Sequence, residues 1–114
     1  MTTPHTLAVR DAVRGIQMFR KTGTRLLGAV QNMSTFACPC CGAATPVFGD
    51  AAAAAAALGR DHGLDLLADL PIIVRQSVAD DDDDARPAVV ADPDGDAAAA
   101  FLRVARRVAE KIEM

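Results

Sequence analysis

The sequence predicts an α/β fold with about two parallel strands, flanking helices and an incomplete sheet. Two short apolar runs, 25–32 and 64–70, are separated by a helical segment, and strands that alternate with helices are typical of a parallel sheet. A parallel sheet normally has several strands and two covered faces, so we expect another chain or segment to complete this one. The length of 114 residues predicts a single partial domain over residues 1–114.

The first helix and the first strand have clear sequence signals. Thr3 can cap a helix that has Pro4 at its first position, and apolar residues repeat along one face as far as a stop near Gly23. Arg25 to Asn32 is a short apolar run after a glycine turn, as in a buried parallel strand.

Loop chemistry follows, and then a second helix. Residues 33–48 contain the cysteines, two prolines and a glycine without any period, so they predict an ordered loop or a small knuckle. Asp50 can cap a helix over residues 51–62, which is rich in alanine and ends at Gly63.

The last third of the chain is less regular. Residues 64–70 predict a second strand that ends at Pro71, and residues 72–78 predict a short helix. The Asp80–Asp84 run predicts an exposed acidic loop over 79–86, because it lacks the ligand spacing of a calcium-binding loop. Residues 87–93 are expected to be extended at best, and a final amphipathic helix starts at Asp94 or Asp96.

Composition excludes several classes of protein. The net charge of −3 and the absence of a Lys/Arg cluster argue against a nucleic-acid binder. The N-terminal residues do not resemble a signal peptide, and no apolar run approaches the length of a membrane span, so we expect a cytoplasmic location and no membrane contact. Three cysteines within four positions suit metal ligation or redox chemistry better than a disulfide framework.

Cys38 and Cys41 are the natural pair of metal ligands in Cys38-Pro39-Cys40-Cys41-Gly42. The proline and the glycine favour a tight turn that would let two thiolates converge on one metal. Cys40, between them, is expected to point elsewhere, either as an accessory thiol or, as we favour, as a tolerated small residue. Tetrahedral zinc and cubane iron-sulfur clusters both usually take four protein ligands. His5 and His62 are poor candidates for the other two, because both lie in or beside predicted helices.

A two-fold dimer supplies the missing ligands more simply. One Cys38 and Cys41 pair from each subunit would form the four-cysteine site of a [4Fe-4S] cluster on the symmetry axis. The alternative from a different class is a small zinc-binding interaction module, because Cys-Pro-x-Cys-Gly also resembles a zinc knuckle. A nonfunctional, partly folded fragment is a third hypothesis.

Residues on both sides of the cysteines extend the motif along nearly the whole chain. The segment from Gln31 to Gly42, which reads Gln-Asn-Met-Ser-Thr-Phe-Ala-Cys-Pro-Cys-Cys-Gly, resembles the signature of the Mrp/ApbC family, iron-sulfur carrier P-loop ATPases related to MinD. The other matching segments are Thr2-Thr3-Pro4-His5, Asp11, Arg14-Gly15, Met18-Phe19, Leu27-Gly28, Phe48-Gly49, Leu70-Pro71, Arg86-Pro87 and Ala91-Asp92-Pro93.

The resemblance implies a doubly wound P-loop NTPase fold, of which this chain is the C-terminal portion. It also implies a homodimer that holds a labile [4Fe-4S] cluster between its cysteine loops and passes it to apo iron-sulfur proteins. Cys38 and Cys41 match the cluster ligands. Asn32 matches a residue near the adenine in relatives, and the segment around Pro71 is similar to the other side of that base pocket.

Departures from the family pattern limit what the chain is expected to do. No glycine-rich phosphate loop with Lys and Ser/Thr is present, so we expect no ATP hydrolysis unless a separate P-loop half supplies the site for ATP and magnesium. Gln31 stands where the family usually has Glu, Asp50-Ala51 replaces a glycine pair, and residues 71–75 look like a shortened form of a family stretch.

Overall fold

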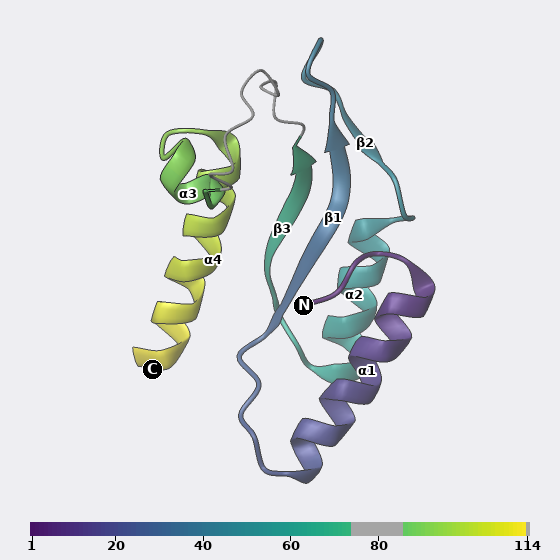
Figure 1. Cartoon of the computed structure of the whole chain (residues 1–114). Coiled ribbons are helices and arrows are strands. Elements are labelled where there is room, and N and C mark those ends of the chain that lie inside the picture. The colour runs from purple at the N-terminus through teal and green to yellow at the C-terminus, as the bar shows by residue number, and fades with distance from the viewer. Residues whose placement is uncertain (74–85, 114) are drawn as a thin grey trace.

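The computed structural model describes residues 1–73 and 86–113. A three-stranded mixed sheet of order β2-β1-β3 lies at its centre, made by β1 (Ala29–Ala37), β2 (Ala44–Pro46) and β3 (Leu66–Ile73). β1 pairs with β3 in parallel, as predicted, and with β2 in antiparallel. The helices α1 (Thr6–Lys21) and α2 (Ala51–His62) lie on one side of the sheet, and α4 (Asp96–Glu113) lies on the other (Figure 1).

The cap of α1 differs from the prediction. The N-cap is His5 instead of Thr3, and its Nδ1 accepts a hydrogen bond from the Leu7 N–H at 3.1 Å. Pro4 therefore precedes the cap, and α1 ends at Lys21, just before Gly23 with its φ of 72°. His5 thus acts as a helix cap through one of its two ring nitrogens.

β1 lies further along the chain than predicted. It begins at Ala29, directly after Gly28, whose backbone lies so close to the start of β3 that a Cβ there would lie 2.7 Å from the Asp65 carbonyl oxygen. It continues to Ala37, and β2 follows at Ala44–Pro46, so the predicted ordered loop or knuckle over 33–48 is a β-hairpin whose connecting loop covers residues 38–43. Antiparallel pairing of β1 with β2 satisfies backbone groups that an irregular loop would leave unpaired.

The second half also contains confirmed and corrected elements. α2 has the predicted caps, with Asp50 accepting from the Ala53 N–H at 3.0 Å and Gly63 at a φ of 63°. β3 runs through Pro71 to Ile73, so it neither ends at Pro71 nor gives way to a helix at Ile72. The β1–β3 register shifts between Asn32 and Phe36, opposite Pro71, and such an irregularity tolerates a residue without an N–H.

The C-terminal region forms two helices. The short helix α3 (Ala88–Ala91) occupies the stretch predicted to be extended, because Pro87 at its N-cap favours the start of a helix. α4 begins at Asp96, as predicted, and packs on β3. Lys111 in α4 forms a 2.8 Å ion pair with Asp65, just before β3. The predicted helix 72–78 beyond Ile73 and the acidic loop 79–86 before Arg86 lie outside the described residues.

The buried core is small and lies largely between the sheet and α1 and α2. Ile16, Leu58 and Leu64 form its buried cluster, against which Val9, Val13, Leu26 and Ala29 pack. On the α4 side, Ala98 and Ala100 are buried, as is Leu70 of β3. Over the described residues, no helix has the length and apolar character to cross a membrane.

Leu58 should contribute strongly to stability. It is 2% exposed, so Leu58→Ala removes buried apolar contacts and should lower the free energy of unfolding by about 2–5 kcal/mol. Leu7, at 63% exposure, gives the matched control, and Leu7→Ala should change it by less than about 0.5 kcal/mol. Urea unfolding followed by circular dichroism measures both, and equal effects of the two substitutions would contradict this core.

Candidate metal centre and adjoining pocket

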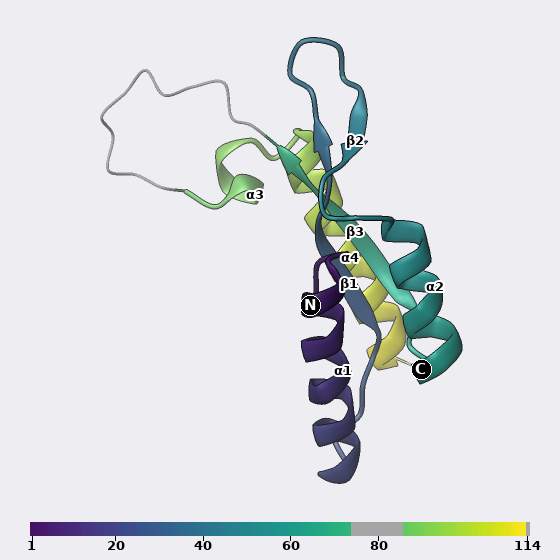
Figure 2. The same cartoon turned by 90° about the vertical axis from the view of Figure 1, so that its right-hand side faces the viewer.

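The three cysteines lie at the tip of the β1–β2 hairpin, which projects beyond the rest of the fold (Figure 2). Two backbone hydrogen bonds close the tip: the Cys38 N–H donates to the Ala43 carbonyl at 3.0 Å, and the Gly42 N–H donates to the Cys38 carbonyl at 2.9 Å. Gly42 has a φ of 72°, which an L-residue with a side chain adopts at a cost. The turn therefore folds Cys41 back toward Cys38.

Cys38 is the thiol that this turn activates. Hydrogen bonds from the backbone N–H groups of Cys41 and Cys40, together with the thiol of Cys41, lower the pKa of the Cys38 thiol. Donors aimed at a sulfur stabilise the thiolate, which is the form that binds metals. All three cysteines are free; Cys38 is half-buried, and Cys40 and Cys41 are exposed.

The described residues do not form a complete metal site at the tip. Among residues 1–73 and 86–113, no group of three or more His, Cys, Asp or Glu side chains is arranged to hold a metal ion. Neither histidine adds a ligand at the tip. His5 caps α1, and His62 is the last residue of the 12-residue helix α2, about 18 Å of helix from Ala51. Two thiols from this hairpin would therefore need ligands from elsewhere.

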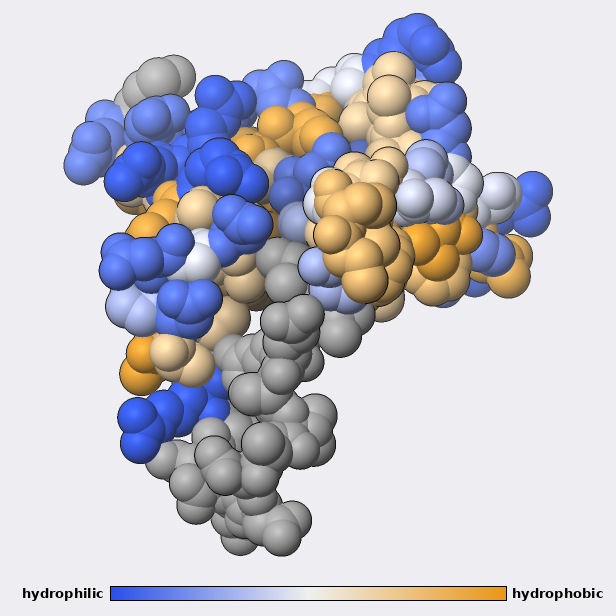
Figure 3. Space-filling model, turned by 90° about the horizontal axis from the view of Figure 1, so that it is seen from above, coloured by the Kyte–Doolittle hydropathy of each residue, from blue (hydrophilic) through white to orange (hydrophobic). Residues whose placement is uncertain are grey.

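Apolar side chains surround the base of the hairpin. Met33, Val47 and Phe48 are each more than a third exposed. The view from the hairpin end shows hydrophobic surface between hydrophilic regions (Figure 3). The cysteine tip therefore stands next to surface that a second protein could cover.

The predicted base-pocket residues Asn32 and Pro71 line one cavity. It measures 170 Å³ and lies between the ends of β1 and β3 and the helices α3 and α4; its other lining residues are Leu70, Ala88, Ala97, Ala100 and Phe101. The Asn32 Oδ1 accepts a hydrogen bond from the Met33 N–H at 2.8 Å, and Asn32 contributes to the lining of the cavity. The cavity is smaller than the roughly 300–1,000 Å³ of most ligand sites, so it suits one part of a ligand.

The residues on either side of Asn32, Gln31 and Met33, position this part of β1, and their roles were not predicted. Gln31 is fully buried, and its Nε2 donates to the Ala51 carbonyl at 2.9 Å, which ties β1 to the start of α2. Met33 has a φ of 53°, a left-handed conformation that is uncommon for a residue with a side chain. The buried role of Gln31 could have been suspected from the sequence, because it is a polar residue within an apolar strand. Nothing in the sequence indicates the left-handed conformation of Met33.

Comparisons with known proteins support the motif assignment. A family model described as "ParA: NUBPL iron-transfer P-loop NTPase" matches residues 1–109. The mouse iron-sulfur cluster transfer protein NUBPL is 38% identical over 99% of this chain and 34% of its own length. The Escherichia coli K12 iron-sulfur cluster carrier protein is 35% identical over 98% of this chain and 29% of its own length. The chain thus spans about a third of the length of these relatives.

A solved structure is also similar to part of the chain. It is a nucleotide-binding protein from Archaeoglobus fulgidus in complex with ADP, with 34% identity, a TM-score of 0.46, and coverage of 62% of this chain and 28% of that one. The family match over residues 1–109 includes the hairpin and the strands that carry it. The chain therefore belongs to the Mrp/ApbC family of iron-sulfur cluster carriers, the NUBPL-type iron-transfer P-loop NTPases.

Proposed function

We propose that this chain is the cluster-binding portion of an iron-sulfur carrier, which holds a [4Fe-4S] cluster in a homodimer and passes it to apo iron-sulfur proteins. The observation that carries the proposal is the hairpin tip, where backbone N–H groups lower the pKa of the Cys38 thiol beside the thiol of Cys41. Its relatives are named as cluster carrier and transfer proteins.

Dimer formation through the hairpin follows from the number of ligands. Each tip offers Cys38 and Cys41, and a cubane cluster takes four cysteine thiolates, so two tips related by a two-fold axis complete the set. The exposed Met33, Val47 and Phe48 at the base of the hairpin provide apolar surface for that contact.

Exposure of the tip also suits transfer of the cluster. Cys41 is exposed, so a thiolate of a recipient protein can approach the iron atom that Cys41 would bind. That thiolate would then take the place of Cys41 as the ligand of the iron. Such exchange needs free thiols in both partners, which is why we place the carrier in a reducing compartment, the cytoplasm.

The nucleotide role is divided between this chain and the P-loop portion of the family's fold. We propose that Asn32 and Pro71 contact the adenine, with the Asn32 amide pairing to the base edge and Pro71 packing on its face. ATP and magnesium need a phosphate loop, which this sequence lacks, so the chain should hydrolyse ATP only when a P-loop half is supplied.

Anaerobic reconstitution with iron and sulfide tests cluster binding. We expect the wild-type chain to gain the brown absorption of a [4Fe-4S] cluster and to elute as a dimer, with four irons per two chains. Cys38→Ala and Cys41→Ala should each lose more than 90% of this absorption, because a thiolate ligand is missing. Cys40→Ala is the matched control and should retain it.

Zinc binding is the competing result of the same experiment. A colourless chain that holds one tightly bound zinc through Cys38 and Cys41, and takes up no iron and sulfide, would replace the carrier assignment with a zinc-binding module. Equal cluster content in Cys40→Ala and Cys38→Ala would exclude the proposed ligand pair.

The pH dependence of alkylation tests the activated thiol. In the Cys40→Ser, Cys41→Ser double variant, Cys38 is the remaining thiol and the backbone N–H donors are retained. Because these donors lower the pKa of the folded thiol, the iodoacetamide reaction should reach half its maximal rate at a lower pH in the folded chain than in the same chain in urea. Identical midpoints would show that the turn does not stabilise the thiolate.

Nucleotide binding by Asn32 is testable once the P-loop portion is present. In a complex of this chain with such a portion, Asn32→Ala should weaken ATP binding about tenfold, since one pair of hydrogen bonds to the base contributes about 1–1.5 kcal/mol. GTP binding, measured in parallel, should change less. Unchanged ATP affinity would remove Asn32 from the base site, whereas cluster loading should be unaffected in either case.

A further inference from the structure

The hairpin tip carries one thiol more than the proposed cluster site uses. Cys38, Cys40 and Cys41 are all free, and the loop that carries them projects from the fold (Figure 2). Two cysteines separated by two residues also have the usual spacing of redox-active dithiols. A carrier is without its cluster after each delivery, and at that stage its thiols are open to oxidation.

The backbone of the tip brings Cys38 and Cys41 within the span of a disulfide. The Gly42 N–H donates to the Cys38 carbonyl at 2.9 Å, so residues 38–42 form one closed turn. A tight turn holds the Cα atoms of its first and fourth residues within about 7 Å, and a disulfide spans Cα separations of about 4.4–6.8 Å. The Cys41 thiol donates a hydrogen bond to the Cys38 sulfur. A disulfide between these two residues can therefore close without a change of fold.

Cys40 is a poor partner for either of the other two cysteines. Its thiol also reaches the Cys38 sulfur, but Pro39 alone separates the two residues, and the fixed φ of proline restrains so short a ring. A disulfide to the adjacent Cys41 would close across a single planar peptide bond, at a strain that the longer ring avoids. The unstrained pair is therefore Cys38 with Cys41, and Cys40 stays a free thiol.

Exposure sets the order in which the two thiols react. Cys41 is exposed, whereas Cys38 is half-buried. A small disulfide that arrives from solvent is therefore attacked first by the Cys41 thiolate, and the Cys38 thiolate then attacks the sulfur of Cys41. The second step takes place within one chain, and the closed turn keeps its entropic cost low.

We propose that the hairpin tip, when it holds no cluster, reacts with a small-molecule disulfide such as glutathione disulfide to form an intrachain Cys38–Cys41 disulfide, which prevents cluster binding. In the first step the Cys41 sulfur bonds to one glutathione sulfur, and the other glutathione leaves as a thiolate. In the second step the Cys38 sulfur bonds to the Cys41 sulfur and expels the remaining glutathione as a thiolate. The two protons lost by the protein thiols convert these thiolates to two molecules of glutathione, and two electrons pass from the chain to the glutathione disulfide.

The proposal rests on the proposed function in one respect, because the cluster is what the disulfide excludes. Bound iron would occupy both thiolates, so a loaded carrier resists this oxidation and an empty one does not. Reducing thiols reverse the reaction by the same exchange. The balance of thiols and disulfides around the protein would thus set the fraction of the carrier that can take up a cluster.

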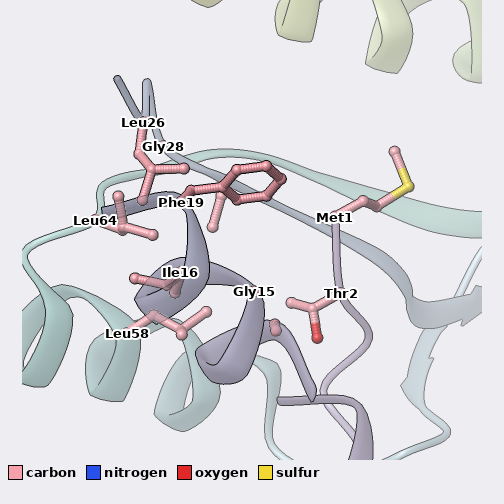
Figure 4. Close-up of a pocket in the computed structure, with 11 residues that line it drawn as sticks. Met1, Thr2, Gly15, Ile16, Phe19, Leu26, Gly28, Leu58 and Leu64 are labelled. Carbon is pink, nitrogen blue, oxygen red and sulfur yellow. The ribbon is translucent and has the colours of Figure 1, made fainter. Parts of the chain in front are cut away.

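Closure of the tip should leave the fold intact. The buried cluster of Ile16, Leu58 and Leu64 lies between the sheet and the helices α1 and α2, where these residues line the pocket in Figure 4. The hairpin projects beyond this part of the molecule (Figure 2). Oxidation should therefore stop cluster loading without lowering the melting temperature of the chain, and a lowered melting temperature would contradict the proposal.

Mass spectrometry after incubation with glutathione disulfide tests the reaction on the metal-free full chain. The Cys40→Ala variant should lose two hydrogen atoms and carry no glutathione, whereas Cys38→Ala and Cys41→Ala in the same background should each carry one glutathione. Iron and sulfide are then added without a reductant. The oxidised Cys40→Ala chain should take up about tenfold less cluster than the reduced chain, and dithiothreitol should restore the uptake.

A glycine substitution tests whether the turn closes the ring. Gly42 has a φ of 72°, so Gly42→Ala opposes the turn, and the mixed disulfide on Cys41 should persist about fivefold longer before Cys38 displaces the glutathione. Gly23→Ala is the matched control. Gly23 also has a φ of 72°, and at both glycines a Cβ would meet no described atom within 4 Å, but Gly23 lies beyond the end of α1. Its substitution should leave the lifetime unchanged.

Several results would overturn the proposal. They are a lasting glutathione adduct on Cys40→Ala without an intrachain disulfide, disulfides that join two chains instead, normal cluster uptake by the oxidised chain, and equal lifetimes in Gly42→Ala and Gly23→Ala. A reduced chain that takes up no cluster, although the disulfide forms as expected, would refute the carrier function and leave the redox reaction standing. A reduced chain that loads normally but does not oxidise would refute the redox reaction alone.

Discussion

The rest of this structure depends on the contacts that the strand β1 makes with its neighbours. It pairs with β3 on one side, and with β2 and Thr2 on the other. Gln31 fixes β1 to α2 through a fully buried side chain. Because these pairings fix the strand in the sheet, the positions of Asn32 on β1 and of Cys38 directly after it are set relative to each other.

At the hairpin tip, a turn of a few residues is enough to favour the thiolate form of Cys38. The same turn that brings Cys41 back to Cys38 aims its N–H groups at the Cys38 sulfur. Backbone donors are fixed by the fold and remain when side chains change, so the chemistry depends on the turn more than on burial. An exposed tip would keep a bound cluster accessible, which suits the proposed carrier better than a protein that retains its cluster.

Sequence patterns predicted the elements whose signals are local. α2 followed from alanine propensity with Asp50 and Gly63 as caps, and the parallel pairing of the two apolar runs followed from their separation by a helix. The extension of β1 to Ala37 and the strand β2 depend on pairing with each other, which no local signal reveals. Cys38 and Cys41 were predicted as a pair, but the N–H donors that distinguish Cys38 belong to the turn geometry.

The position of Met33 bears on how a nucleotide could influence a cluster. Asn32 lies on β1, and Cys38 directly follows the strand, six residues along the chain and up to about 20 Å away. Met33, with its φ of 53°, interrupts the ladder to β3 directly after Asn32. The Met33 N–H is held by the Asn32 side chain itself. A base that bound the Asn32 amide would therefore act on the residue of β1 in a left-handed conformation, and the strand beyond it ends just before Cys38, the proposed cluster ligand. Coupling between the two sites would then need no rearrangement of the core, because the irregular segment between them already lies outside the regular pairing.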